Sequence, residues 1–464
     1  MPEPKKNNTE RLSPAKRRDT IRMAYLVSIF MTTGNVCLMG PPFQLFAIKL
    51  GCSEFYLGLI NFILWSAGLF GIFGIKIIEK YGKIKCLIIC RTISLVISLG
   101  FALLAFLASA SRLHYGLILA AIIPILLLRS IFSGIGSSGW FPILQDNVPP
   151  RIRGSFFASL RTKWQIAALT ANLALMFILG KDAGFTRIGF VLLFSCLIML
   201  YSVLFLKNMN EAPPLPDSEK PSIRRRFMET LKSGRIRRFL VYIVSYNLAV
   251  FISSAFQIKY MKQLGYSDAH VIAVTATISA GAILSLRFWG RIADSYGNRA
   301  LLSISHLGVG VSLLAWIFIG NSTASFIFIM FAVAARSIFH HGNGIAQTRY
   351  MLSAVPEDKQ GMIVIINIFM TFSIAVAPLL GGFFLTLTGG LQPDVLPLGM
   401  NHYQMLFILS SLMMIVPHSI RKGFRVAGET PTAQVLMLLQ RPTLNRLNHF
   451  VRIAASPVKG KDKK

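Results

Sequence analysis

The sequence predicts an all-α polytopic membrane protein with twelve transmembrane helices arranged as two related six-helix bundles. The composition is the first reason: 54% of the 464 residues are hydrophobic, only 14% are charged, and the mean hydropathy is +0.59. Soluble domains rarely have so apolar a composition. Since a helix needs ~20 apolar residues to cross a bilayer, twelve such helices with their loops fill almost the whole chain. The second reason is an internal repeat, described below.

The positions of the apolar runs define the expected helices, because charged residues, Pro or Gly bound each run. In the first half we expect helices near 23–48, 55–78, 85–108, 114–143, 156–180 and 186–206. In the second half we expect them near 239–263, 269–289, 300–320, 323–349, 360–387 and 402–419. The chain then divides into a tail (1–22), a bundle (23–206), a basic linker (207–238), a second bundle (239–420) and a basic tail (421–464).

The basic residues are concentrated in three segments that an even number of spans places on one side of the membrane. Residues 1–22 hold seven Lys/Arg against three acids, residues 207–238 nine against four, and residues 421–464 ten against two. The net charge of +30 could also indicate a nucleic-acid-binding protein, but this distribution is typical of cytoplasmic loops. We therefore expect a protein of the inner or plasma membrane, with both termini cytoplasmic and no nucleic-acid partner.

Other sequence features narrow the function further. Residues 1–22 contain no apolar stretch, so we expect no cleaved signal peptide. The five cysteines have neither metal-ligand nor disulfide-framework spacing, and no nucleotide-binding loop or nucleophile triad occurs. We expect no metal, no cofactor and no enzyme activity, and we expect a monomer. The segment 433–455 fits either an interfacial helix on anionic lipids or a solvated tail.

Three short patterns occur in both halves and in the same order. Arg-Ser-Ile-Phe stands at 129–132 and again at 336–339. Phe-Gln followed by Leu-Gly begins at 43 and at 256, and Glu-Lys-Tyr-Gly-Lys at 79–83 returns as Asp-Ser-Tyr-Gly-Asn at 294–298. Three ordered matches indicate duplication of a six-helix unit. Six spans per unit give both copies the same orientation in the membrane.

The segment 290–299, Gly-Arg-Ile-Ala-Asp-Ser-Tyr-Gly-Asn-Arg, resembles the cytoplasmic signature loop G-x-x-x-D-x-x-G-x-[RK] of the major facilitator superfamily. The first-half copy at 75–85 is weaker, because Ile75 replaces the leading glycine and Glu79 the aspartate. The resemblance extends over roughly 23–420. It implies a transporter that works by alternating access, with a central cavity lined by the first, fourth, seventh and tenth helices.

The resemblance also implies a gating role for Glu79, Gly82, Lys83, Gly290, Asp294, Gly297 and Arg299. The physical basis is readable from the residues. Gly82 and Gly297 allow a tight turn with positive φ at a helix end. An acid at 79 or 294 can accept hydrogen bonds from the N-terminal amides of a neighbouring helix and so latch one side of the protein. The alternative is that both loops only brace their helices.

Two arginines lie inside apolar segments, and none of the eighteen acids does. Arg129 and Arg336 each lie ~28 Å of helix from the next Val-Pro element, near the middle of their spans. An ionised arginine there costs at least about 2.5–3.5 kcal/mol unless it faces the bundle interior or an aqueous cavity. Its partners are then carbonyls, water, neutral side chains or an anionic ligand. His340, one turn after Arg336, could supply proton coupling.

These residues predict a carrier for a small organic anion or a solute bearing an anionic group, with Arg129, Arg336 and His340 as candidate substrate ligands. Asn35, Gln44, Asn247 and Gln257 are further candidates for the cavity wall, with helix packing as the alternative for each. Arg161 and Lys163 are expected at the membrane surface. Two other interpretations stay open. The arginines could brace each half in a multidrug or sugar carrier, or the protein could be a sensor or assembly factor that transports nothing.

Overall fold

The computed structural model describes residues 12–111, 113–149, 152–212, 223–296, 298–355, 361–389, 400–421 and 424. A few side chains inside these ranges, among them those of Glu79, Arg287 and Asp294, lie outside the description. The predicted interfacial segment 433–455 and Gly297 also lie outside the described residues.

The first half of the chain contains nine α-helices and one 3-10 helix within the described residues, and several spans are made of two consecutive helices. They are α1 (Pro14–Met39), α2 (Pro41–Lys49), α3 (Glu54–Ser66), η1 (Ala67–Phe70), α4 (Gly71–Tyr81), α5 (Lys83–Ser109), α6 (Tyr115–Ser137), α7 (Trp140–Asn147), α8 (Arg153–Leu179) and α9 (Phe185–Lys207).

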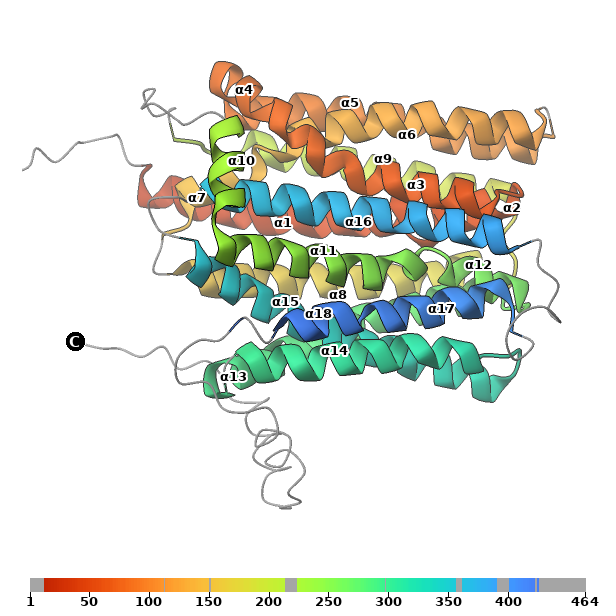
Figure 1. Cartoon of the computed structure of the whole chain (residues 1–464). Coiled ribbons are helices and arrows are strands. Elements are labelled where there is room, and N and C mark those ends of the chain that lie inside the picture. Colours follow the sequence, from red (N-terminus) through yellow and green to blue (C-terminus); the bar gives the residue numbers. More distant parts are fainter. Residues whose placement is uncertain are drawn as a thin grey trace, which may run out of the picture.

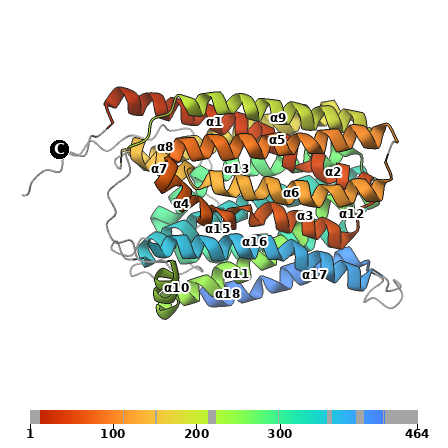
Figure 2. The same cartoon turned by 90° about the horizontal axis from the view of Figure 1, so that it is seen from above.

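The second half repeats this plan after one short helix in the linker. Its elements are α10 (Ile223–Lys232), α11 (Gly234–Ser254), α12 (Gln257–Gln263), α13 (Asp268–Tyr296), α14 (Asn298–Leu314), η3 (Ala315–Phe318), α15 (Thr323–Ala354), α16 (Gly361–Thr388), α17 (His402–Met413) and α18 (Ile415–Ile420). Figure 1 and Figure 2 show the long helices lying side by side along one common direction, while α10 runs across this direction in Figure 1.

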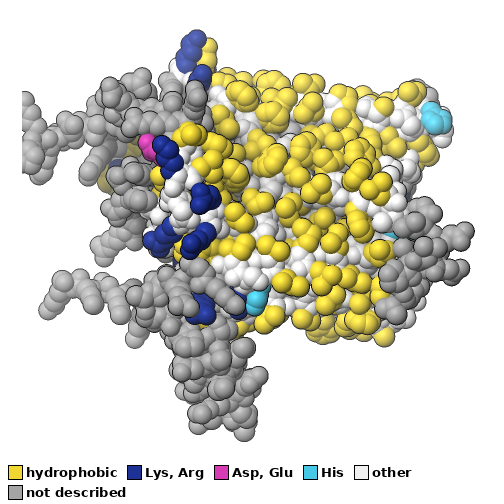
Figure 3. Space-filling view, in the orientation of Figure 1, with side chains coloured by type: hydrophobic (Ala, Val, Ile, Leu, Met, Phe, Trp, Pro, Cys, Tyr) yellow, Lys and Arg dark blue, Asp and Glu magenta, His cyan; other side chains and the backbone are white. Residues whose placement is uncertain are grey.

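The described helices include twelve that are long and apolar enough to cross a membrane. Large side chains on their outer surface are strongly exposed, for example Phe177 at 78% and Leu284 at 74%. Figure 3 shows apolar side chains covering the middle of the molecule, while Lys and Arg gather at one end. The structure therefore confirms the predicted all-α membrane fold. We call the end that carries the start of α1, Lys83, Arg153 and Arg235 the basic end, and the other the opposite end.

Several helices extend beyond the predicted limits. The first span begins at Pro14, where the Ser13 side chain accepts a hydrogen bond from the Lys16 amide as an N-cap. The span is divided at Gly40, because Pro41 suits the first turn of a new helix but cannot continue the old one. Helix α13 continues to Tyr296, so Gly290 and Asp294 lie on a helix and not in the predicted loop.

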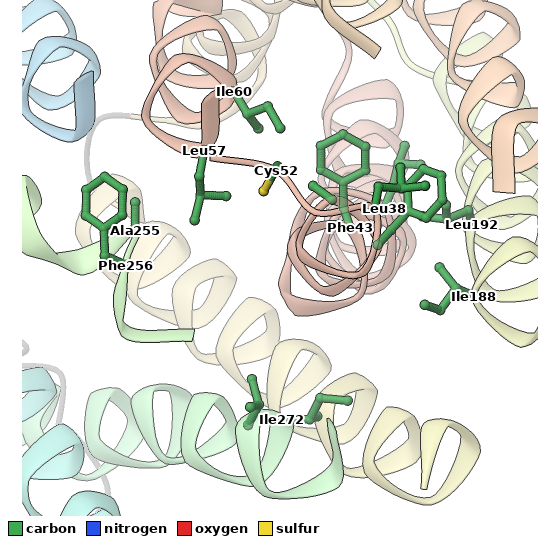
Figure 4. Close-up of a cluster of buried hydrophobic side chains, with 14 of the residues drawn as sticks. Leu38, Phe43, Cys52, Leu57, Ile60, Ile188, Leu192, Ala255, Phe256 and Ile272 are labelled. Atoms are coloured by element: carbon green, nitrogen blue, oxygen red, sulfur yellow. The ribbon is translucent and has the colours of Figure 1, made fainter. Parts of the chain in front are cut away.

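The two halves share one hydrophobic core at the opposite end but have separate cores near the basic end. The shared core joins residues of the first half, such as Phe43 and Leu57, to residues of the second half, such as Phe256. Figure 4 shows part of it, with Cys52 and Leu57 beside the second-half residues Ala255 and Phe256. Near the basic end, the core around Val27 belongs to the first half and the core around Phe239 to the second.

Glycines allow close contact between the halves at the opposite end, where α3 packs against α16. A Cβ at Gly58 would lie 2.6 Å from the Pro378 carbonyl oxygen, and one at Gly382 would lie 2.7 Å from that of Glu54. Small residues let helix backbones approach to this distance. The second contact between the halves pairs α8 with α13. The molecule is thus packed together at one end and divided at the other.

Candidate functional site

A cavity of about 800 Å³ lies between the two halves. Helices α1, α5, α6, α7 and α8 contribute to its wall from the first half, and α11, α15 and α16 from the second. Its exposed wall residues, including Arg161, Trp164 and Thr348, lie toward the basic end. The volume is in the range of sites that bind small molecules.

The wall of this large cavity is positively charged. Among the described residues that line it, the charged side chains are Arg91 on α5 and Arg161 on α8, and no Asp or Glu occurs. The Arg91 Nη1 atom is buried and has no hydrogen-bond acceptor. His340 and His341 also line the cavity, and His340 Nδ1 lies 2.9 Å from the Tyr246 hydroxyl. The described wall therefore has cationic side chains and no carboxylate to neutralise them.

A second cavity of about 230 Å³ lies between this large cavity and the opposite end. It contains Arg336 from α15, Gln44 from α2, Gln257 from α12 and Trp316 from η3. Met261, which also lines it, stands beside Lys262 in the chain. No Asp or Glu is found among the described residues of its wall.

The predicted substrate residues separate into three groups. Asn35, Asn247 and His340 line the large cavity, and Gln44, Gln257 and Arg336 line the small one. Asn247 also joins two helices, because its amide donates to the Ser373 hydroxyl at 2.9 Å. Arg129 lines neither cavity, although its position in the repeat matches that of Arg336.

Arg129 is enclosed within the first half. It is 6% exposed, its Nε donates to the Ser98 hydroxyl at 3.1 Å, and its carbonyl accepts from the Ser94 hydroxyl at 3.1 Å. Both serines belong to α5, so the arginine joins α6 to α5. This contact corresponds to the bracing alternative for this copy of the repeat.

A group of ion pairs connects the halves at the opposite end. Asp268, at the start of α13, is fully buried, accepts from Lys262 Nζ at 2.7 Å and lies 3.2 Å from Lys49 Nζ of the first half. Lys49 also pairs with Asp182. In the same region Lys259 Nζ lies 2.8 Å from Glu54 Oε1 and donates to the Cys52 carbonyl at 2.7 Å.

Backbone contacts reinforce this inter-half cluster, which we define as Lys49, Glu54, Asp182, Lys259, Lys262 and Asp268. The Asp268 carboxylate accepts from the Ala183 amide at 2.9 Å, and the Asp268 amide donates to the Lys181 carbonyl at 2.9 Å. The Lys49 ammonium donates a hydrogen bond to Asp182 and thereby holds the pKa of that carboxyl below its usual value. The cluster closes the opposite end of the molecule.

Of the predicted gating residues, those on α4 and α5 form the best-described contacts. Gly82 has φ +89°, as the turn requires. An acid does cap the following helix, but it is Glu211: its Oε2 accepts from the Lys83 and Ile84 amides at 2.6 and 3.0 Å. Lys83 Nζ pairs with Asp146. Gly290 lies inside α13 and Arg299 in the first turn of α14, while the Glu79 and Asp294 side chains and Gly297 lie outside the described residues.

Sequence reasoning missed several of these residues. Arg91 lies close enough to the start of its apolar run to pass for an end residue, and Arg161 was expected at the membrane surface. The acids and lysines of the inter-half cluster lie at span ends, where charged residues are common and carry no signal of burial. Trp316 carries no polar signal in the sequence. Only the fold brings these side chains to cavities or to the closed interface.

Twelve spans in two halves, with a cavity between them that is closed at one end, define a transmembrane transport protein. The sequence model of the Major Facilitator Superfamily matches residues 121–362 and 238–417, and the chain belongs to that superfamily. The expected family is thereby confirmed.

Solved structures with the same fold have little sequence in common with this chain. The nucleoside transporter NupG superposes with a TM-score of 0.63 at 12% identity, covering 88% of this chain and 98% of NupG. A bacterial homologue of the human lysosomal transporter Spinster gives 0.63 at 13%, covering 90% and 100%. The xylose transporter XylE from E. coli gives 0.63 at 13%, covering 90% and 100%. No curated protein matches the chain by sequence.

Proposed function

We propose that this transporter carries a small organic anion across the membrane by alternating access. The observation that carries the proposal is the large cavity, whose charged wall residues, within the described chain, are Arg91 and Arg161. A buried guanidinium without a counter-ion is costly, and an anionic ligand would remove that cost. A carboxylate also matches the planar donor arrangement of arginine.

The packing supports an inward-facing state if the basic end faces the cytoplasm, as the positive-inside rule suggests. The inter-half cluster and the shared core close the opposite end, whereas the cores near the basic end are separate. Opening the opposite end would require breaking these ion pairs while the halves rotate against each other. We further propose that both termini are cytoplasmic, that anionic lipids bind the basic end, and that the protein acts as a monomer.

The residues that line the cavities restrict the possible modes of transport. No carboxylate lines either cavity within the described residues, so proton coupling would have to use His340 or His341. Uniport and anion exchange need no titrating group. An imposed pH gradient across proteoliposomes separates proton coupling from uniport, once uptake into protein-free liposomes, which protonated carboxylic acids enter by diffusion, is subtracted.

The test is a ligand panel with purified protein. Small mono- and dicarboxylates should raise the melting temperature and cross proteoliposome membranes, while sugars and nucleosides of similar size should do neither. Arg91→Gln and Arg161→Gln should each weaken anion binding about 10- to 150-fold, because a hydrogen bond to a charged group contributes about 1.5–3 kcal/mol.

Arg18→Gln is the matched control, because Arg18 is an exposed arginine at the basic end that lines neither cavity. It should leave binding unchanged. If neutral solutes raise the melting temperature and are taken up, while no anion does either, the proposal is refuted and a sugar or multidrug carrier is favoured. No transport of any solute, by protein that remains folded, would instead favour a sensor or assembly factor.

A further inference from the structure

We propose that the small cavity is a second anion site, which receives a small carboxylate after the large cavity and limits the size of the anion that crosses. This inference rests on the proposed function. It assigns a separate role to Arg336, and it adds Trp316 as a ligand residue.

The small cavity contains hydrogen-bond donors that lack acceptors. Gln257 is 7% exposed and its Nε2 has no partner, and Trp316 is 1% exposed and its Nε1 has none. For the Arg336 guanidinium the described part of the chain offers no hydrogen bond or ion pair, in contrast to Arg129. An unsatisfied buried donor costs about 1–3 kcal/mol. Two such donors and the Arg336 guanidinium in the wall of one cavity indicate a ligand rich in acceptors.

The hydroxyl groups in the same wall accept no hydrogen bond from the unpaired Gln257 and Trp316 donors. Ser254 donates to the Phe251 carbonyl at 3.2 Å, and Thr275 donates to the Val271 carbonyl at 2.9 Å. With a cation, an amide and an indole N–H as donors and no carboxylate in the described wall, the site is complementary to an oxyanion. A neutral sugar would leave the guanidinium without a counter-charge.

The size of the cavity restricts the ligand. A water molecule occupies about 30 Å³ in the liquid, so 230 Å³ holds the equivalent of about seven waters. Sites for drug-sized ligands are larger, about 300–1,000 Å³. The site therefore fits a small aliphatic or aromatic carboxylate, while an anion of drug size is too large.

The position of the cavity places it second in the order of binding. Arg336 and His340 are one turn apart on α15, and the first lines the small cavity while the second lines the large one. On its other side the small cavity ends at Met261, beside Lys262 of the inter-half cluster. An anion coming from the large cavity would meet Arg336 directly below the closed opposite end.

Trp316 makes the small cavity observable. The chain has five tryptophans, and replacing Trp65, Trp140, Trp164 and Trp289 by Phe leaves Trp316 as the fluorophore. Iodide, an anionic quencher, should quench Trp316 with a binding-like concentration dependence. Acetate, butyrate and benzoate should compete with it, and a drug-sized carboxylate should not. Neutral acrylamide serves as the control for simple accessibility.

Arg336→Gln should weaken iodide quenching at least tenfold and leave acrylamide quenching unchanged. Gln257→Glu, which keeps the side-chain shape but adds a carboxylate beside Arg336, should have the same effect. Arg129→Gln, the matched variant in the other repeat, should change neither. The replacement side chains are similar in length to the original ones, so the shape of the cavity wall is largely kept. A melting curve of each variant identifies any that does not fold.

Equal iodide quenching in wild type, Arg336→Gln and Gln257→Glu would overturn the small-cavity site. That result is distinguishable from failure of the proposed function. If the anion proposal alone were wrong, wild-type proteoliposomes would take up no carboxylate at all. If only the second site were wrong, wild type would transport carboxylates, Arg91→Gln would impair this, and Arg336→Gln would not.

Discussion

Asp268→Asn should open the end of the molecule that the inter-half cluster holds closed. The Asp268 side chain is 0% exposed and has two lysines as partners, Lys49 from the first half at 3.2 Å and Lys262 at 2.7 Å. Asparagine keeps the shape and can still accept from the Ala183 amide, but it removes the negative charge between two cations. The closed state loses this charge compensation, whereas the lysines regain water when the halves separate.

The expected effect can be estimated from the burial of the partners. Removing one member of a fully buried ion pair costs about 3–5 kcal/mol. The Lys49 and Lys262 side chains are 18% and 21% exposed. Because solvent partly screens their charges, we expect a smaller cost of about 2–3 kcal/mol. Since 1.4 kcal/mol is a factor of ten, the equilibrium should move toward the open opposite end by about 30- to 150-fold.

Cys52 provides the assay. It is 3% exposed in the closed interface, its carbonyl accepts from Lys259 of the other half, and burial raises the pKa of its thiol to about 11. A buried, protonated thiol reacts slowly with maleimides. In a variant whose other four cysteines are alanine, a membrane-impermeant maleimide should label Cys52 from the opposite side about 30- to 150-fold faster after Asp268→Asn.

Asp182→Asn is the matched control. Asp182 also pairs with Lys49, but its side chain is 81% exposed, and exposed pairs contribute about 0–1 kcal/mol. Labelling should therefore rise no more than about fivefold. A labelling rate for Asp268→Asn within twofold of wild type would refute the idea that this cluster holds the end closed. A folded variant that labels equally fast from the basic side would point to general loosening.

Two further predictions concern the turn at Gly82 and the pH dependence of the cluster. Gly82→Ala should destabilise the protein by about 1–3 kcal/mol, because φ +89° with ψ 158° is a region that only glycine adopts readily, and a Cβ would lie 2.7 Å from Glu211 Oε1. Gly234→Ala, with nothing within 4 Å of its Cβ, should not lower the melting temperature. The second prediction concerns pH, because the hydrogen bond from Lys49 lowers the pKa of Asp182 in the folded state. The pair therefore stabilises the folded protein above the unfolded pKa of about 3.9, and this stabilisation is lost as the pH falls through the lower folded pKa. The melting-temperature difference between wild type and Asp182→Asn should be constant from about pH 5 to 8 and shrink as the pH falls below about 3.9. A difference that grows on acidification would contradict this sign.

Arg129 and Arg336 show which properties of the site could be predicted from the sequence. The repeat identified both as embedded cations and left bracing or substrate contact open for each. In the structure Arg129 is buried and donates a hydrogen bond to Ser98, whereas Arg336 lines the small cavity. A helical repeat gives the depth of a residue in the membrane, but its rotation about the helix axis and the identity of its neighbours depend on how the helices pack.

The acids illustrate the same limit. The sequence excluded carboxylates from the span centres, and Asp268 does lie at a helix start. Its complete burial arises because α13 packs against α8 and brings Asp268 to the 180–183 segment of the other half. A contact between residues so distant in the chain leaves no local pattern, so it could not be predicted from composition or spacing.

The sequence by itself determined the twelve spans, their grouping into two related halves, the positively charged end and the family, because hydrophobicity, helix length and repeated motifs are local properties of the chain. The tertiary structure alone decided which cations face a cavity, that Arg91 and Trp316 belong to the candidate sites, and that lysines and acids of both halves meet at the opposite end. These features depend on distances between helices that are far apart in sequence, and only the packed molecule fixes such distances.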